Sequence, residues 1–470
     1  MLPYTSVWQV LLVVGLIGPT TLALLYQIAV EIFLWVWGEQ PLSLFRRIGS
    51  DSLRPSRTLT TYVPVWIASL AVSRAWIGMP HNEDNMNSTF ASVLFIVISL
   101  GVSCWYLMPL TRYELVEGGP PPPIPTLQTF EMTTQQPVLV CITGCNTGIG
   151  YETAKQLLLA NQQSAISLTL VMLCRDLTRA QTAKQGLLQS LRQYQSTDKK
   201  QASSKSKIAI VIVQCDLSNL QSVRTAVKTL CDRYQPRHNK DPGPIQILIN
   251  NAGLMMHSRR TTVDGYELVM QANHLGHYLL TRLLIQANMM NPKGRILNLT
   301  SSTYVLARKW SDMVLSDLFC ETPQRTYSLF GQYAASKLCN IWFTTELARR
   351  YGGGAQNGAC NGKNNRLALQ IHAIHPGMVR TDVVKNMPWY LRYPNSIFAM
   401  IVQQFQKTPA QGAWNTIALC TDNDTSNVGQ NGLYWVNRGP QDLWSFAKNP
   451  NAAKELWDIS AKLVDLPATD

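Results

Sequence analysis

The clearest chemical pattern in the chain is QYAASK, in which Tyr333 and Lys337 stand four residues apart. Positions i and i+4 of a helix share one face, so the phenol and the ammonium would point at the same spot. A free tyrosine has a pKa of about 10 and transfers protons poorly at neutral pH. A nearby cation favours the phenolate, so we expect Lys337 to lower the pKa of Tyr333 toward neutrality.

A group of hydroxyl side chains precedes that pair. The stretch GRILNLTSS reads as a strand that ends in Thr300, Ser301 and Ser302. Ligands of parallel sheets bind at the carboxyl ends of strands, where such a hydroxyl could hydrogen-bond a reacting oxygen. Because a strand alternates its faces, the residues alone leave all three hydroxyls open. The stretch CETPQRTYSLFG before Tyr333 reads as an insert that shapes the substrate entrance.

A glycine-rich stretch, CITGCNTGIG, stands between an apolar run and a stretch with helical spacing. Gly144 can take a tight turn, while Gly148 and Gly150 let backbone approach a diphosphate and let the helix pack close to the sheet. The free N–H groups of the helix N-terminus would face the phosphates. The stretch therefore predicts a nucleotide site and not a plain turn.

Short apolar runs rich in β-branched residues alternate with helical stretches in the second part of the chain. This pattern predicts a parallel sheet covered by helices on both faces, that is, a Rossmann-type doubly wound α/β fold. We expect strands within 137–142, 168–174, 207–215, 245–250, 294–300 and 367–374. Two polar inserts, 195–207 and 352–365, read as surface loops.

These motifs together resemble the short-chain dehydrogenase/reductase family over about residues 137–440. The likeness lies in the spacing Thr143-Gly144-x-x-x-Gly148-Ile149-Gly150, followed in order by NNAG, NLTSS and YAASK. It implies a nicotinamide cofactor, with Tyr333 as the proton donor and acceptor, Ser301 on the substrate carbonyl and Lys337 on the nicotinamide ribose. Asn273, in QANHLGH, would hold a water beside the lysine, which completes a catalytic set of Asn273, Ser301, Tyr333 and Lys337.

The resemblance also implies which residues hold the cofactor. In the family, NNAG ends the fourth strand and lines the cofactor, and the loop IHPGMVRTD closes over the nicotinamide. The expected cofactor-binding residues are Gly144, Asn146, Thr147, Gly148, Ile149, Gly150, Arg175, Asp176, Asp216, Asn251, Ala252, Gly253, Tyr333, Lys337, Pro376, Gly377 and Thr381.

The end of the second strand bears on the choice of cofactor. It reads LCRD, with Arg175 where an acidic residue would accept the ribose hydroxyls of NAD. A guanidinium pairs with a 2′-phosphate, so NADP(H) is favoured, while the neighbouring Asp176 leaves NAD(H) open. Asp216 stands where family members contact the adenine.

Metal and nucleic-acid sites are not indicated. His274 and His277 have a spacing that suits packing, with no acidic third ligand nearby. The ten cysteines form no CxxC pair or zinc spacing, so they read as reduced thiols. The formal net charge of +13 comes from scattered basic residues after residue 117 and forms no block typical of nucleic-acid binding.

Residues 1–116 read as an α-helical membrane region that precedes the catalytic domain. The stretches Trp8–Val30 and Ser88–Leu110 are free of charge and long enough to span a bilayer. Thr58–Ser73 is shorter and contains a proline, so two or three spans are expected. A proline-rich linker, 117–136, leads to a catalytic domain at 137–470.

The loops between these stretches predict an orientation. Arginines lie between the first and second stretches, and the positive-inside rule places that loop in the cytosol. Three spans would then leave Asn87 of the sequon Asn-Ser-Thr in the lumen and return the chain to the cytosol. We expect the endoplasmic reticulum membrane, with the catalytic domain facing the cytosol.

An apolar stretch after the IHPGMVRTD loop, 383–406, reads as core packing or as a lid that faces membrane lipid. The chain is most similar to the membrane-bound retinol dehydrogenase group, and closest to its polyprenol dehydrogenase branch, in the segments LINNAGLMM, HLGHYLLT, KTPAQGAW and NGLYWVN. That likeness implies a lipophilic alcohol and its aldehyde or ketone: a polyprenol, a retinoid or a sterol. A catalytically silent NADP-binding membrane scaffold is the alternative, and a homodimer is left open.

Overall fold

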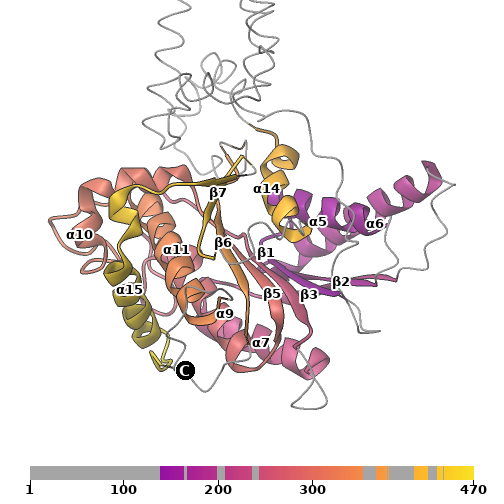
Figure 1. The fold of residues 1–470 in the computed structure, drawn as a ribbon, viewed down its shortest axis with the longest axis horizontal. Helices are drawn as coiled ribbons and strands as arrows, with labels where there is room; N and C mark the ends of the chain where they lie inside the picture. The colour runs from indigo at the N-terminus through magenta and orange to yellow at the C-terminus, as the bar shows by residue number, and fades with distance from the viewer. Residues whose placement is uncertain are drawn as a thin grey trace, which may run out of the picture. The chain divides into compact units, whose positions relative to one another are not determined.

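The computed structural model describes residues 138–162, 167–197, 207–235, 243–352, 367–377, 379, 407–421, 431–437 and 439–469. The chain divides after Gly119, and every described residue belongs to the second unit, Pro120–Asp470. Figure 1 shows a twisted sheet with helices on both of its faces. This arrangement is the Rossmann-type α/β fold that the alternation of apolar runs predicts.

The described strands form one sheet in the order β3-β2-β1-β4-β5-β6-β7-β8. All neighbours from β3 to β7 are parallel, and only β8 runs antiparallel to its neighbour. The order reverses between β1 and β4, which makes the carboxyl ends of these two strands the expected ligand position. The strands are β1 Val138–Thr143, β2 Leu168–Cys174, β3 Ile208–Gln214, β4 Ile245–Asn250, β5 Met290–Leu299, β6 Gln370–Ile374, β7 Tyr434–Val436 and β8 Gly439–Gln441.

Helices cover the sheet in two layers. One layer holds α5 Gly148–Asn161, α6 Leu177–Thr197 and α14 Pro409–Thr421; the other holds α7 Leu220–Tyr234, α9 Gly276–Gln286, α11 Leu329–Tyr351 and α15 Pro450–Leu463. Shorter elements are α8 Leu268–Met270, the π-helical turn η2 Gln271–Leu275, the 3-10 helices η3 Ser302–Trp310 and η6 Ser445–Lys448, and α10 Ser311–Val314.

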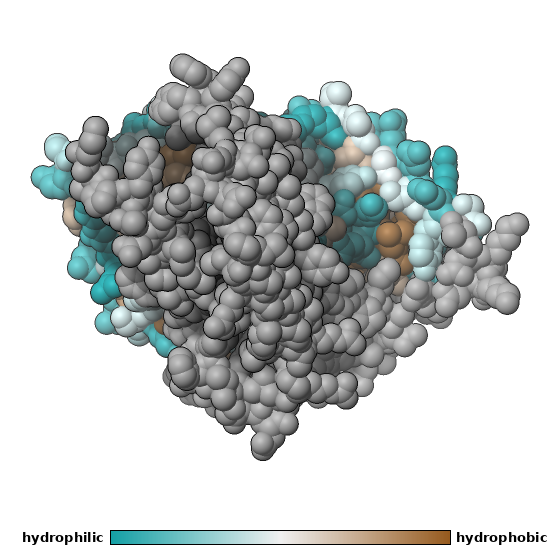
Figure 2. Space-filling view, turned by 90° about the horizontal axis from the view of Figure 1, so that it is seen from above, coloured by the Kyte–Doolittle hydropathy of each residue, from teal (hydrophilic) through white to brown (hydrophobic). Residues whose placement is uncertain are grey.

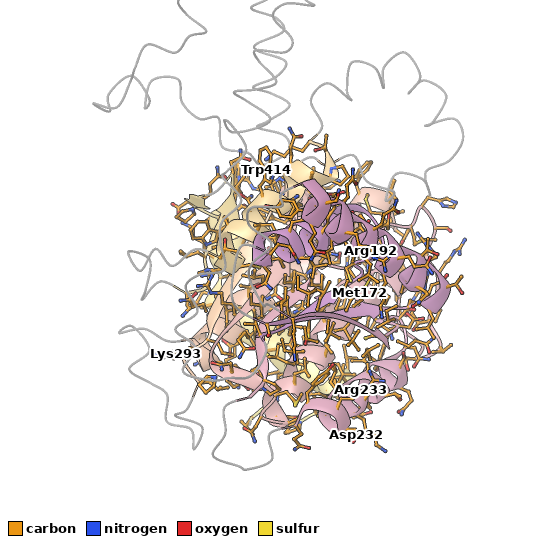
Figure 3. All side chains as sticks on the ribbon, turned by 90° about the vertical axis from the view of Figure 1, so that its right-hand side faces the viewer. Met172, Arg192, Asp232, Arg233, Lys293 and Trp414 are labelled. Carbon is orange, nitrogen blue, oxygen red and sulfur yellow. The ribbon has the colours of Figure 1, made fainter. Side chains whose placement is uncertain are left out.

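The central strands are buried on both faces, which explains why their apolar runs are continuous. In β1, Leu139 and Cys141 belong to the core beneath α7, α9 and α11, whereas Val140 and Ile142 belong to the core beneath α5 and α6. Met172 of β2 is buried in the interior, whereas Asp232 lies at the edge of the view in Figure 3 and is exposed, as is Arg192.

Polar residues set where several helices begin. Asn219 accepts a hydrogen bond from the Ser222 backbone N–H at the start of α7, and Ser328 accepts one from Gly331 at the start of α11. The second of these caps fixes the start of the helix that carries Tyr333 and Lys337. One loop prediction was wrong at its beginning: α6 continues to Thr197, so Gln195 is helical.

Several predictions concern residues outside the described part of the chain. These are the three apolar stretches, Asn87, the linker, Thr381, the apolar stretch 383–406 and most of the two polar inserts. Among the described helices, none has both the length and the apolar composition that crossing a bilayer requires. The described surface seen in Figure 2 is largely hydrophilic, with smaller hydrophobic areas.

Candidate active site

A cleft of about 340 Å³ lies at the carboxyl ends of β1, β2, β3 and β4. Twelve predicted cofactor residues line it together: Gly144, Asn146, Thr147, Gly148, Ile149, Gly150, Arg175, Asp176, Asp216, Asn251, Ala252 and Gly253. Lining residues that the sequence analysis missed include Arg179, Ser218, Leu254 and Met255. Arg179 lies in the first turn of α6, and an exposed helical arginine carries no local signal that could have identified it.

The glycine loop needs its glycines for two reasons. Gly144 and Gly148 have positive φ angles of 64° and 61°, which disfavour residues with a side chain. A Cβ on Gly144 would lie 2.8 Å from the Ala252 Cβ, and one on Gly150 would overlap the Asn251 side chain. The loop is therefore packed against the NNAG turn, and α5 begins directly after it with its N-terminus at the cleft.

The NNAG turn holds that loop through hydrogen bonds. The Asn251 side-chain amide donates to the carbonyls of Thr143 (2.8 Å) and Gly144 (3.2 Å). The backbone N–H groups of Asn251 and Ala252 donate to Thr143 Oγ1 at 2.9 and 3.0 Å. These bonds fix the floor of the cleft.

Lys337 borders the cleft from α11. Its Nζ lies 3.3 Å from the point where a Cβ on Gly253 would stand, and it donates to the Leu299 carbonyl at 3.1 Å. The same Nζ lies 5.4 Å from the centroid of the Tyr333 ring. Burial lowers the pKa of Lys337 to about 8.

Thr300, Ser301 and Ser302 follow β5, and of these three Ser301 forms a side-chain hydrogen bond with Tyr333. Thr300 is buried and donates to the backbone carbonyl of Lys337 at 2.8 Å. Ser302 is also buried, and its backbone N–H donates to His375 Nδ1 at 3.3 Å.

The expectation that Lys337 lowers the pKa of Tyr333 is wrong. Burial raises the pKa of Tyr333 to about 12, and the hydrogen bond from Ser301 opposes that shift only in part. The reason is geometric: the Lys337 ammonium lies beside the ring and donates to the Leu299 carbonyl. At neutral pH the phenol is thus protonated and is able to donate its proton.

Asn273 lies in the π-helical turn η2, fully buried. Its Oδ1 accepts from the Leu254 N–H at 2.8 Å, and its Nδ2 donates to the Leu254 carbonyl and to Ser336 Oγ, each at 3.0 Å. The Asn273 amide thereby joins the segment after NNAG to the helix that carries Tyr333 and Lys337.

The two histidines of QANHLGH are both buried. His274 Nε2 lies 2.9 Å from Ser460 Oγ. Burial lowers the pKa of His274 to about 3 and that of His277 to about 4, so both rings are neutral at pH 7. Across the described residues, no three His, Cys, Asp or Glu side chains gather as metal ligands would.

The loop after β6 contacts the segment that leads into α14. Gly377 has a φ of 88°, and a Cβ there would lie 3.0 Å from Lys407 Nζ. A Cβ on Gly412 would lie 3.3 Å from the side chain of Ile149, so the start of α14 packs beside the glycine loop. The expected cofactor residues Pro376 and Gly377 are not among the residues that line the cleft.

Two carboxylates line the cleft beside the carboxyl ends of β2 and β3. Asp176 Oδ1 accepts from the Arg179 backbone N–H at 3.0 Å, which commits that oxygen to the first turn of α6. Asp216 Oδ1 accepts from the backbone N–H and the hydroxyl of Ser218 at 2.9 and 2.6 Å. Arg175 and Arg179 remain as the two cations of this part of the cleft.

The chain between β5 and α11 forms η3, α10 and a loop that continues to Ser328, and the expected insert, CETPQRTYSLFG, comprises the end of this loop and the start of α11. The Tyr327 hydroxyl donates to the Met256 carbonyl at 3.1 Å, and Arg259 pairs with Glu321 at 2.5 Å. The insert is therefore attached to the segment that follows the NNAG turn.

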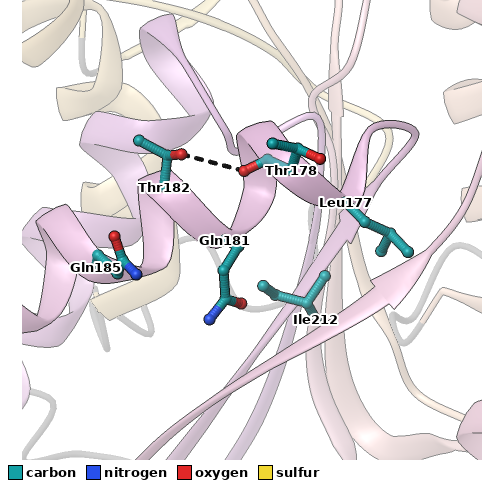
Figure 4. A pocket seen from close by; sticks show the side chains of 6 residues that line it. All are labelled: Leu177, Thr178, Gln181, Thr182, Gln185 and Ile212. Carbon is teal, nitrogen blue, oxygen red and sulfur yellow. Dashed lines mark hydrogen bonds between the residues drawn. The ribbon is translucent and has the colours of Figure 1, made fainter.

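A second hollow, of about 520 Å³, lies between α6 and β3 (Figure 4). Its walls are Leu177, Thr178, Gln181, Thr182, Gln185 and Ile212, none of which titrates or acts as a nucleophile at neutral pH. We therefore place the chemistry in the first cleft.

Comparison with known proteins agrees with this assignment. The short chain dehydrogenase family matches residues 172–310. Retinol dehydrogenase 14 from Homo sapiens is 32% identical over 327 residues, which cover 70% of this chain and 86% of that protein. Retinol dehydrogenase 11 from Homo sapiens is 30% identical over 334 residues, with the same coverage of 70% and 86%.

Among solved structures, salutaridine reductase from Papaver somniferum is 19% identical, covers 63% of this chain and 99% of its own, and has a TM-score of 0.42. The identity and coverage of the two retinol dehydrogenases place the protein: the chain belongs to the short-chain dehydrogenase/reductase family, in its retinol dehydrogenase-like group, and is an oxidoreductase that acts on CH–OH groups.

Proposed function

We propose that this chain interconverts a lipophilic alcohol and its aldehyde or ketone with NADP(H). The observation that carries the proposal is the meeting of Tyr333 with Ser301 and Lys337, next to the cleft lined by the glycine loop. Lys337 links the two parts, because its ammonium stands against Gly253 of the cleft wall.

The cleft fits a dinucleotide phosphate. Gly144 and Gly253 leave space that a side chain would fill, and the N-terminus of α5 favours an anion. Arg175 and Arg179 stand where a 2′-phosphate would need cations. Because Asp176 caps α6 with one oxygen, it is less suited to hold two ribose hydroxyls, and this favours NADP(H) over NAD(H).

The residues divide the chemistry between them. The nicotinamide supplies or accepts the hydride. In reduction, Tyr333 donates its proton to the oxygen that gains charge, and Ser301 donates a hydrogen bond to the same oxygen. Lys337, whose ammonium stands against Gly253 of the cleft wall, would hold the nicotinamide ribose. Asn273 holds Ser336 and the Leu254 backbone, which keeps α11 in place.

The substrate class follows from the relatives. The proteins named above are retinol dehydrogenases, and retinol is a lipophilic primary alcohol. Retinoids, polyprenols and sterols share a hydroxyl or carbonyl group on a large apolar body. We take retinal and a polyprenal as the first substrates to test, since the segments LINNAGLMM and NGLYWVN support the polyprenol assignment.

We also propose that residues 1–116 anchor the protein in the endoplasmic reticulum membrane, with the catalytic domain in the cytosol. The long uncharged stretches and the arginines between them support this. We expect the protein to stay in the membrane fraction during alkaline extraction. We also expect a glycosidase to lower its apparent mass, and Asn87→Gln to abolish that decrease. Extraction into the soluble fraction would overturn the anchor.

The function is tested with the full chain solubilised in detergent. NADPH oxidation is followed with retinal, a polyprenal and a sterol ketone, and NADP⁺ reduction with the matching alcohols. Turnover that is lost in Tyr333→Phe while NADPH still binds supports the proposal. Tight NADPH binding without turnover on any lipid carbonyl or alcohol would favour the scaffold instead.

A further inference from the structure

His277 is a buried histidine on α9 whose two ring nitrogens contact different parts of the site. Its Nδ1 lies 3.0 Å from the Asn273 backbone carbonyl, and its Nε2 lies 2.9 Å from Thr143 Oγ1. A carbonyl oxygen only accepts, so Nδ1 carries the proton. In the neutral ring Nε2 is then an acceptor.

The Thr143 hydroxyl completes this assignment. Its oxygen accepts from the backbone N–H groups of Asn251 and Ala252, which uses both of its lone pairs. Its single proton is therefore donated, and Nε2 of His277 at 2.9 Å is a better acceptor than the Ile249 carbonyl at 3.4 Å. His277 thus determines how the Thr143 hydroxyl is oriented beneath the NNAG turn.

The contacts continue in both directions from the ring. On one side, Thr143 holds the Asn251–Ala252 backbone, which lines the cleft. On the other side, Asn273 donates to Ser336 Oγ, and Ser336 donates to the Tyr333 backbone carbonyl at 2.7 Å. One imidazole therefore connects the cofactor turn to the helix that carries the proton donor.

We propose that His277 is a positioning residue that, through Thr143 and Asn273, sets the NNAG turn of the cofactor cleft relative to Tyr333 and Lys337. The inference rests on the proposed function. Burial and the Lys337 cation lower the pKa of His277, which keeps the ring neutral and the hydrogen-bond pattern constant at physiological pH. A histidine that only fills space would not need both nitrogens matched to these two partners.

Three substitutions separate the two contacts. His277→Asn keeps a donor near the Nδ1 position and loses the acceptor for Thr143. His277→Gln places an amide oxygen near the Nε2 position, where it can accept from Thr143. His274→Asn is the matched control, because it removes another buried histidine, one that contacts Ser460 on α15 and not the cleft.

The first measurement is amide hydrogen exchange in the peptide LINNAGLMM, residues 248–256. We expect His277→Asn to raise exchange at Asn251 and Ala252 by about tenfold, since the acceptor of their hydrogen bonds is no longer held. His277→Gln should restore slow exchange. His274→Asn should lower the thermal midpoint without changing exchange in this peptide.

The second measurement separates hydride transfer from cofactor binding. We expect His277→Asn to lower kcat about tenfold and to raise the deuterium isotope effect with labelled NADPH, while the Kd for NADPH changes less than about threefold. Unchanged exchange at 251–252 together with an unchanged isotope effect would make His277 a packing residue. If the proposed function is wrong, the unsubstituted protein will show no turnover. The exchange measurement does not depend on turnover and would still decide the role of His277.

Discussion

The ammonium of Lys337 lies 3.3 Å from the point where a side chain on Gly253 would place its Cβ. This contact joins the catalytic helix α11 to the turn that lines the cofactor cleft. The φ of Gly253 is not in the left-handed range, so what its glycine provides is space: a Cβ there would require Lys337 to shift by a few tenths of an ångström.

Gly253→Val is expected to lower kcat/KM at least a hundredfold, because its branched side chain would displace Lys337 and narrow the cleft. Steady-state kinetics and the Kd for NADPH measure this loss. Gly439→Ala serves as the control, since nothing lies within 4 Å of its Cβ position, and it should change neither quantity. Full activity in Gly253→Val would mean that Lys337 is not held where the structure places it.

The lowered pKa of Lys337 predicts how the reaction depends on pH. The residue is cationic below about pH 8 and loses its charge above it, so kcat/KM should fall as the pH rises through about 8. Tyr333, with a pKa of about 12, stays protonated throughout this range. Lys337→Arg should shift the loss to higher pH, because arginine keeps its charge; an unchanged midpoint would assign the titration to another group.

The same pKa predicts a stability effect of opposite direction. Between pH 8 and 10.5 an unfolded chain still binds the Lys337 proton, whereas the folded chain has released it. The free energy of unfolding therefore rises with pH in this window. Lys337→Met should lack this rise when denaturant unfolding is compared at pH 8 and pH 10. A variant that shows the same rise as the parent protein would contradict the buried cation.

Arg175 and Arg179 are expected to select the cofactor. Each change to alanine should raise the Kd for NADPH about tenfold and leave the Kd for NADH nearly unchanged, because the lost charge-assisted bonds reach only the 2′-phosphate. Arg192→Ala on α6 is the control, since its side chain is exposed and does not line the cleft. Equal losses for both cofactors would place these arginines on the diphosphate or outside the site.

The alternation of apolar runs was sufficient to predict the parallel sheet, because β1, β2 and β4 are buried along their whole length and are mostly apolar. The sequence did not reveal β7 and β8, which have three residues each and carry no period of their own. Their place in the sheet comes from pairing alone, since β7 pairs with β6 and β8 with β7.

The glycine loop and the NNAG turn could be predicted as cofactor residues because the glycines themselves indicate positive φ angles or close backbone approach. Arg179 could not, since an exposed helical arginine has no local signature. The pKa of Tyr333 was mispredicted because desolvation depends on the packing around α11, which spacing alone does not give. The contact between Thr143 and His277 joins residues that are 134 positions apart in the sequence, and no local sequence pattern predicts it.

Tyr333→Phe with Ser302→Ala as its matched control tests the central claim most directly, namely that the Tyr333 hydroxyl is the proton donor beside the cofactor cleft. Both variants remove one hydroxyl near the end of β5, but only Tyr333 meets Ser301. We predict that Tyr333→Phe lowers kcat/KM about a thousandfold while the Kd for NADPH stays within about threefold, and that Ser302→Ala changes neither by more than that. Turnover by Tyr333→Phe at the rate of the unsubstituted protein would contradict the account.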